Sequence, residues 1–124
     1  MEIELLPIAT IVRLGAEYSA FQESMLNETE EEIIRVLDDA NTANLILDFQ
    51  RTAYFGSVFF EVLFRLWKRT HAAGGQFFLC SLHPDCREIL ETARLTTLWD
   101  ILPDVASCLS QMQANESLHI RATS

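Results

Sequence analysis

The chain has 124 residues, a length typical of one domain with one main core. Apolar residues make up 49% of it and charged residues 22%, a balance that excludes a wholly disordered chain. The formal net charge of −9 argues against nucleic acid or an anionic membrane surface as a partner, because binding to phosphates needs concentrated basic surface.

The first half of the chain predicts two strands, a helix and a third strand. Residues 3–7 and 9–14 have the pattern of two short strands, interrupted at Pro7. A helix follows, with Asn27 as its N-cap and Glu30 at the spacing of a capping box. The nearly continuous apolar run at 44–49 predicts a strand that is covered on both faces.

The second half continues the alternation. A helix from about Ser57 to Ala72 ends at a Gly-Gly pair, and residues 76–82 form the next apolar run. Two prolines, at positions 84 and 103, each open a helix, and a short strand, "TLWDIL", lies between these helices. Residues 113–124 lack periodicity, so we expect a domain over 1–112 and a flexible C-terminal tail.

This order of elements predicts an α/β fold in a single domain. Strands that alternate with helices imply right-handed crossovers and parallel pairing. We therefore expect a mixed, mostly parallel sheet of about five strands, packed against about four helices.

The helix that begins at Ser57 carries two apolar stripes, whereas an amphipathic surface helix needs one. The stripe expected to face the sheet consists of Phe59, Val62, Leu63 and Leu66. The second consists of Phe60, Phe64 and Trp67. These three aromatic residues either pack beneath neighbouring helices or form a patch for a protein partner or a homodimer.

Catalytic and metal-binding motifs are not found. Cys80, His83 and Cys86 are ligand types, but Cys80 falls in a predicted buried strand and no fourth zinc ligand is evident. There is no Ser-His-Asp arrangement, phosphate-binding glycine loop or HExxH motif. We expect no cofactor, no metal and no enzymatic activity.

The location is predicted from the cysteines and from the hydropathy. Three cysteines without a framework spacing are typical of free thiols in a reducing cytoplasm. The N-terminal residues lack the pattern of a signal peptide, and no apolar run is long enough for membrane insertion.

The stretch "LILDFQRTAYFGSVFFEVLFRLWKRTHAAGGQFFLCSL" resembles the STAS domain, the fold of bacterial anti-sigma factor antagonists. The resemblance extends over about residues 11–109. In that family a buried strand ends in Leu-Asp, and a short loop, an Asp-Ser-Ser-Gly or Asp-Ser-Thr-Gly motif and an apolar helix ending in Gly-Gly follow. The matching positions are Leu47, Asp48, Leu63, Arg65, Leu66, Lys68, Arg69, Gly74 and Gly75.

The family motif is altered in this chain to Gly56-Ser57-Val58-Phe59. Only Ser57 carries over, at the position that is the phosphate acceptor in regulated family members. The resemblance implies a non-enzymatic module in transcription regulation, whose Ser57 is phosphorylated by a kinase-type anti-sigma factor that binds this helix.

Three interpretations remain open at this point. Ser57 suits a helix cap as well as a phosphate acceptor, and a partner would contact Gly56, Ser57, Phe59 and the second aromatic stripe. The alternative is a constitutive scaffold subunit that acts in a homodimer or a larger complex without phosphorylation. A small-ligand sensor is the third interpretation, although the sequence offers no recognisable pocket chemistry.

Overall fold

A five-stranded sheet forms the centre of the computed structural model, which describes residues 1–15, 23–40, 42–52 and 57–123, with the backbone alone at 23–25, 57–58 and 117–123. The order across the sheet is β1-β2-β3-β4-β5; β1 pairs antiparallel with β2, and every later pair is parallel. The strands are β1 (Glu2–Leu5), β2 (Thr10–Arg13), β3 (Leu45–Asp48), β4 (Phe77–Cys80) and β5 (Asp100–Leu102). The predicted fold class is confirmed.

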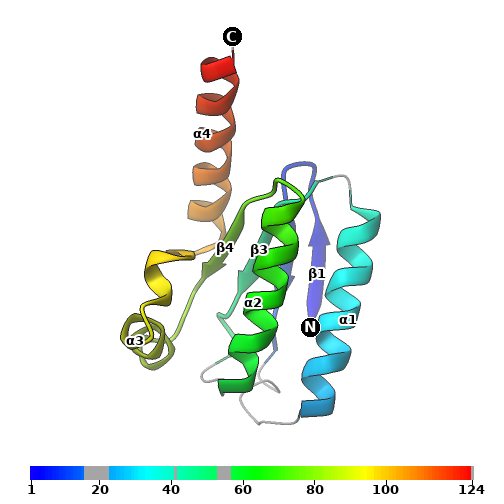
Figure 1. The fold of residues 1–124 in the computed structure, drawn as a ribbon, viewed down its shortest axis with the longest axis vertical. Helices are drawn as coiled ribbons and strands as arrows, with labels where there is room; N and C mark the ends of the chain where they lie inside the picture. Colours follow the sequence, from blue (N-terminus) through cyan, green and yellow to red (C-terminus); the bar gives the residue numbers. More distant parts are fainter. Residues whose placement is uncertain (16–22, 41, 53–56, 124) are drawn as a thin grey trace.

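The helices lie on both faces of this sheet. In Figure 1, α1 and α2 lie side by side in front of the sheet, and α4 projects beyond it toward the C-terminus. The helices are α1 (Glu23–Asp39), α2 (Ser57–Ala72), α3 (Pro84–Thr92), the 3-10 turn η2 (Leu95–Thr97) and α4 (Val105–Thr123). The bounds of α2 agree with those expected from the sequence.

Alternation along the central strands divides the core into two clusters. Leu45 and Leu47 of β3 pack in the larger cluster, with the apolar residues of α1, α2 and α3. Ile46, between them, packs in the smaller cluster with Cys108 and Met112 of α4. Successive strand residues point to opposite faces, so burial on both faces explains the continuous apolar run.

Several expected element bounds are wrong, among them that of β5, which begins at Asp100 because residues 95–97 form the turn η2. Helix α1 begins at Glu23 rather than after Asn27, because Leu26 and Thr29 are buried on the same helical face as Ile33 and extend the buried stripe toward the N-terminus. Helix α4 continues to Thr123, so residues 113–123 are helical where the sequence predicted a loose tail. The domain boundary at 112 stays a prediction.

Polar contacts hold the first turns of α4 beyond residue 112. Asn44, which is 5% exposed, donates from Nδ2 to Ile8 O at 2.9 Å and to Glu116 Oε1 at 3.0 Å, and its Oδ1 accepts from Gln76 N at 2.7 Å. Asn115 Nδ2 donates to Gln76 Oε1 at 2.7 Å. These bonds join α4 to the sheet through side chains that apolar periodicity does not register.

The end of α2 shows why two glycines stand together. Gly75 N donates to Thr70 O at 2.8 Å and Gly74 N to His71 O at 3.0 Å, the bonding pattern of a Schellman motif. Gly74 has φ +80°, which favours glycine. A Cβ on Gly75 would collide with the backbone of Ala43, so the second glycine permits a close approach between α2 and the segment leading into β3.

Candidate functional site

The sequence predicted the functional region just after β3, at the carboxyl end of this strand. Backbone hydrogen bonds to the segments on either side hold the chain there. Leu14 N donates to Asp48 O at 3.0 Å, and Phe49 N donates to Cys80 O at 3.0 Å. The next turn is closed by Thr52, whose Oγ1 donates to Gly15 O at 3.0 Å. Ligands of open α/β sheets bind beyond the carboxyl ends of parallel strands, which makes this edge the natural candidate site.

Asp48 is a buried carboxylate at this edge, with 5% of its side chain exposed. Its Oδ1 accepts from Gln50 N at 3.0 Å, and its Oδ2 lies 3.8 Å from Arg13 Nε. Arg13 also donates to Glu4 Oε1 at 2.8 Å across the β1–β2 pair. The carboxylate therefore shapes the turn after β3 and has an opposite charge nearby.

Helix α2 begins at Ser57, so the predicted phosphate acceptor stands at a helix N-terminus. Gly56 lies outside the described residues, and only the backbone is described at Ser57. Free N–H groups and the helix dipole make such a position favourable for an anion. Both roles predicted for Ser57, helix cap and phosphate acceptor, stay predictions.

The stripe expected to face the sheet is confirmed. All four of its residues are buried in the larger core cluster: Phe59, Val62, Leu63 and Leu66. The ring of Phe59 meets the ring of Phe49 edge to face, with centroids 6.0 Å apart. Because Phe59 is only 2% exposed, the predicted partner contact of this residue would need rearrangement of the first turn of α2.

The second stripe packs largely within the molecule. Phe60, Phe64 and Trp67 are partly buried against the larger core cluster. The ring of Phe64 contacts that of Trp99 edge to face, at 5.1 Å between centroids, and Trp99 is itself 2% exposed. Trp67 stacks on His71 at 5.7 Å. Of the two interpretations offered for this stripe, packing beneath neighbouring elements describes it better than an open aromatic patch.

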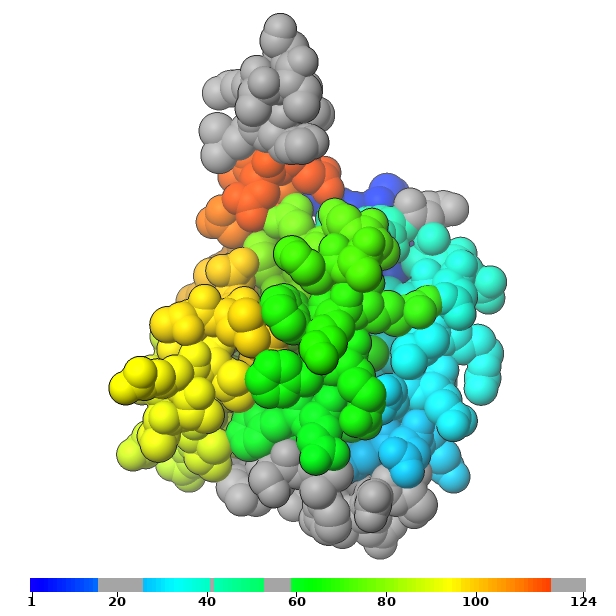
Figure 2. Space-filling view, in the orientation of Figure 1, coloured from blue at the N-terminus to red at the C-terminus, as the bar shows by residue number. Residues whose placement is uncertain are grey.

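The remaining outer edge of α2 is charged and joined to α1. The guanidinium of Arg65 binds Glu30 of α1 at 2.6 to 2.9 Å through two nitrogens. The hydrogen bond to Glu30 raises the pKa of Arg65 above its ordinary value. Figure 2 shows α2 in green at the centre of one face, between α1 in cyan and the α3 region in yellow.

The thiols do not form a ligand set. Cys80, Cys86 and Cys108 are all buried, and none of them is in a disulfide bond. In the part of the chain that the structure describes, no three His, Cys, Asp or Glu side chains converge as metal ligands. A hydrogen bond to Cys80, together with burial, raises the pKa of the Cys108 thiol far above its ordinary value.

A family model described as STAS domain matches residues 7–108. The chain belongs to the STAS domain family. Three solved structures show the same fold. The first is an anti-sigma-factor antagonist (STAS) domain protein from Planctomyces limnophilus, with TM-score 0.79 and 24% identity, covering 90% of this chain and 97% of that one.

The other two are more distant in sequence. The anti-sigma factor antagonist SpoIIAA in its unphosphorylated form has TM-score 0.75 and 12% identity, with 91% and 96% of the two chains covered. A structure of the stressosome, a signal integration and transduction hub, contains a chain with TM-score 0.73 and 14% identity, with 93% and 98% covered. No curated protein matches the sequence.

Within this STAS domain, sequence reasoning located the edge and the helix but missed their supports. Trp99 was assigned only to a strand segment, although it closes one side of α2. Thr52 carried no signal for its bond to Gly15. Among the described helices, none combines the length and hydropathy that spanning a bilayer requires.

Proposed function

We propose that this STAS domain is a non-enzymatic regulatory module of a bacterial cytoplasm, which binds a kinase-type anti-sigma factor and so acts on transcription. The binding surface is the carboxyl edge of β3 with the first turns of α2. The observation that carries the proposal is the position of Ser57 as the first residue of α2 in a STAS fold.

Phosphorylation of Ser57 supplies the switch in this proposal. Transfer of the γ-phosphoryl group of ATP to the serine oxygen would add nearly two negative charges at the helix N-terminus, which stabilises anions. A partner that packs on this edge would then bury an unpaired charge, at a large desolvation cost. Binding would therefore be strong to the unmodified serine and weak to the phosphoserine.

The test is a comparison of three forms in a pull-down from the lysate of the source organism. Wild type should retain an ATP-binding, kinase-like protein, identified by mass spectrometry, and Ser57→Asp should lose it. Ser110→Asp is the matched control, because Ser110 is an exposed serine on α4, away from the proposed surface. Loss with both aspartates, or retention with both, would refute the proposed switch, as would native protein without phosphate on Ser57 under every growth condition.

A constitutive scaffold subunit is the second candidate, and Phe59 favours it. The family motif has a small glycine at this position, whereas Phe59 is buried against Phe49 and ties the first turn of α2 to the core. The scaffold would act in a homodimer or a larger assembly, as a STAS-like chain does in the stressosome structure. Sedimentation should then show a dimer at all concentrations, lost with Trp67→Glu and kept with Lys68→Glu, whose side chain is exposed.

A further inference from the structure

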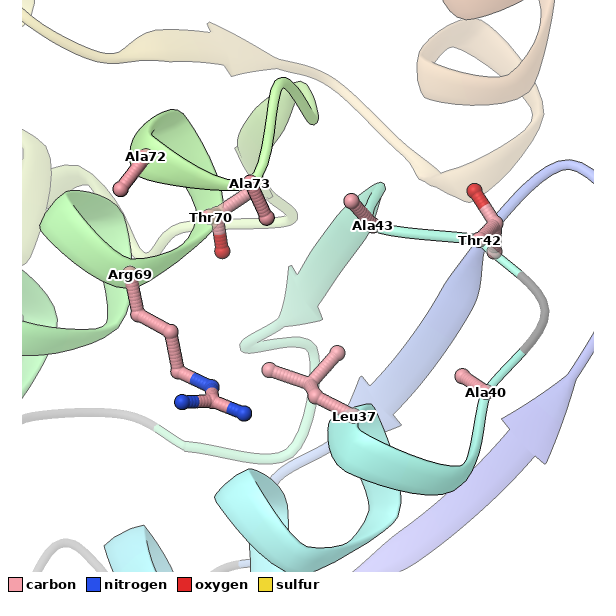
Figure 3. Close-up of a pocket in the computed structure, with 8 residues that line it drawn as sticks. All are labelled: Leu37, Ala40, Thr42, Ala43, Arg69, Thr70, Ala72 and Ala73. Carbon is pink, nitrogen blue, oxygen red and sulfur yellow. The ribbon is translucent and has the colours of Figure 1, made fainter.

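A groove lies between the C-terminal ends of α1 and α2, beside the segment that leads into β3 (Figure 3). Its volume is about 640 Å³. Small apolar groups form most of its wall, with one arginine and two threonines among them. The lining residues are Leu37, Ala40, Thr42, Ala43, Arg69, Thr70, Ala72 and Ala73.

Thr70 presents an unpartnered hydroxyl to this groove. The residue is 2% exposed, and its Oγ1 has no hydrogen-bond partner among the residues that the structure describes. In Figure 3 this oxygen points from α2 into the space above Leu37. A buried hydroxyl without a partner destabilises a protein, so one in a native structure calls for an explanation.

The other polar side chains of the lining have partners, Thr42 among them. Thr42 Oγ1 donates to Ile8 O at 3.1 Å and accepts from Asn44 N at 3.2 Å. The backbone carbonyl of Thr70 accepts from Gly75 N at 2.8 Å. Among the polar side chains that line the groove in the described part of the chain, the Thr70 hydroxyl is therefore the one without a partner.

Arg69 places a positive charge at the same wall. Its guanidinium pairs with Asp38 of α1, and the two side chains are 39% and 58% exposed. Ion pairs at such exposure contribute little to stability, so another carboxylate can replace Asp38 at small cost. Arg69 and Thr70 together offer a cation and a hydroxyl donor beside an apolar surface, which is the chemistry that recognises a carboxylate with a short hydrocarbon chain.

The geometry points to a binding site for a small aliphatic monocarboxylate in this groove. The carboxylate binds the Arg69 guanidinium and the Thr70 hydroxyl, and the chain lies against Leu37, Ala40 and Ala43. The site is separate from the proposed switch, because Thr70 lies about 20 Å along α2 from Ser57. A site of this kind supports the interpretation of the protein as a small-ligand sensor. The sequence alone showed no pocket chemistry for such a role.

Hexanoate is the probe for this site. Titration of the full chain, followed by amide chemical shifts, should give saturable shifts at the ends of α1 and α2, with a dissociation constant on the order of 1 mM for so small a ligand. Hexan-1-ol, which has the same chain without the charge, should bind about tenfold more weakly, and hexylamine should not bind the groove.

Three variants separate this site from non-specific binding. Thr70→Val should weaken hexanoate about tenfold and raise the melting temperature of the free protein, because it removes the unpartnered hydroxyl while keeping the shape. Ala73→Leu should abolish binding by filling the groove. Ala93→Leu is the matched control, since Ala93 is also an exposed alanine at a helix C-cap but lies outside the groove, and it should bind as wild type.

Three results would overturn the proposal. Shifts that do not saturate at about ten times the expected dissociation constant, or that map elsewhere, exclude the site. So does equal binding by wild type and Ala73→Leu. A Thr70→Val variant that is less stable than wild type would show that the hydroxyl has a structural partner and would remove the observation on which the site rests. None of these results depends on Ser57 or on an anti-sigma factor.

Discussion

The two glycines after α2 should respond differently to the same added methyl group. A Cβ on Gly74 would meet no atom within 4 Å, but the residue has φ +80°. A Cβ on Gly75 would meet the carbonyl oxygen of Ala43 and would lie 2.5 Å from its carbonyl carbon. The first substitution is therefore limited by backbone conformation, and the second by space.

The magnitudes follow from these two causes. Gly74→Ala costs about 1–2 kcal/mol for the left-handed conformation, partly offset by about 0.5 kcal/mol of lost unfolded-state entropy, so the net loss is roughly 1 kcal/mol. Gly75→Ala must displace backbone, and such overpacking costs about 3 kcal/mol. The displacement also strains the bond from Gly75 N to Thr70 O.

Urea denaturation gives the free energy of unfolding of both variants and wild type, and thermal unfolding gives their melting temperatures, each followed by circular dichroism. At roughly 3–5 °C per kcal/mol for a domain of this size, Gly75→Ala should lower the melting temperature by about 10 °C and Gly74→Ala by about 4 °C. Equal losses would contradict the close approach of α2 to Ala43. A Gly75→Ala variant within about 0.5 kcal/mol of wild type would refute the packing argument altogether.

Three further substitutions or reactions test other contacts. Asn44→Leu should lose about 2–3 kcal/mol in urea denaturation, because it leaves buried hydrogen-bonding groups unpaired and frees α4; a loss below about 1 kcal/mol would contradict that role. Glu30→Gln should lose less than about 1 kcal/mol, since its partner Arg65 is half exposed, and the difference should shrink in high salt. Cys108, whose thiol pKa is raised by Cys80 and by burial, should resist a disulfide reagent at mildly alkaline pH until the protein unfolds; fast labelling of native protein would refute this.

The sequence was informative wherever a local signal determines the structure. The apolar runs of β3 and β4 reflect burial on both faces, and each lies in the expected segment. The bounds of α2 follow from its stripe and its Gly-Gly end. These features depend on residues a few positions apart, so a single sequence contains them.

Contacts between segments that are distant in the chain could not be predicted from the sequence. Periodicity revealed the stripe that contains Phe64 but could not show that Trp99 would cover it. The end of α4 has no apolar period, and it is held by polar bonds to Asn44 and Gln76, far away in the chain. Thr70 has no local signal either, because its groove exists only when the ends of α1 and α2 meet.

The first turn of α2 is held in place by contacts with the core, and these contacts constrain how a phosphate on Ser57 could act. Phe59 is buried against Phe49, and Thr52 Oγ1 donates to Gly15 O. Unwinding this turn would expose Phe59, at a cost of about 2–3 kcal/mol for a large aromatic side chain. A phosphate at a helix N-terminus favours the helix instead. The proposed switch is therefore better explained by direct charge and desolvation at the partner surface than by a conformational change within this domain.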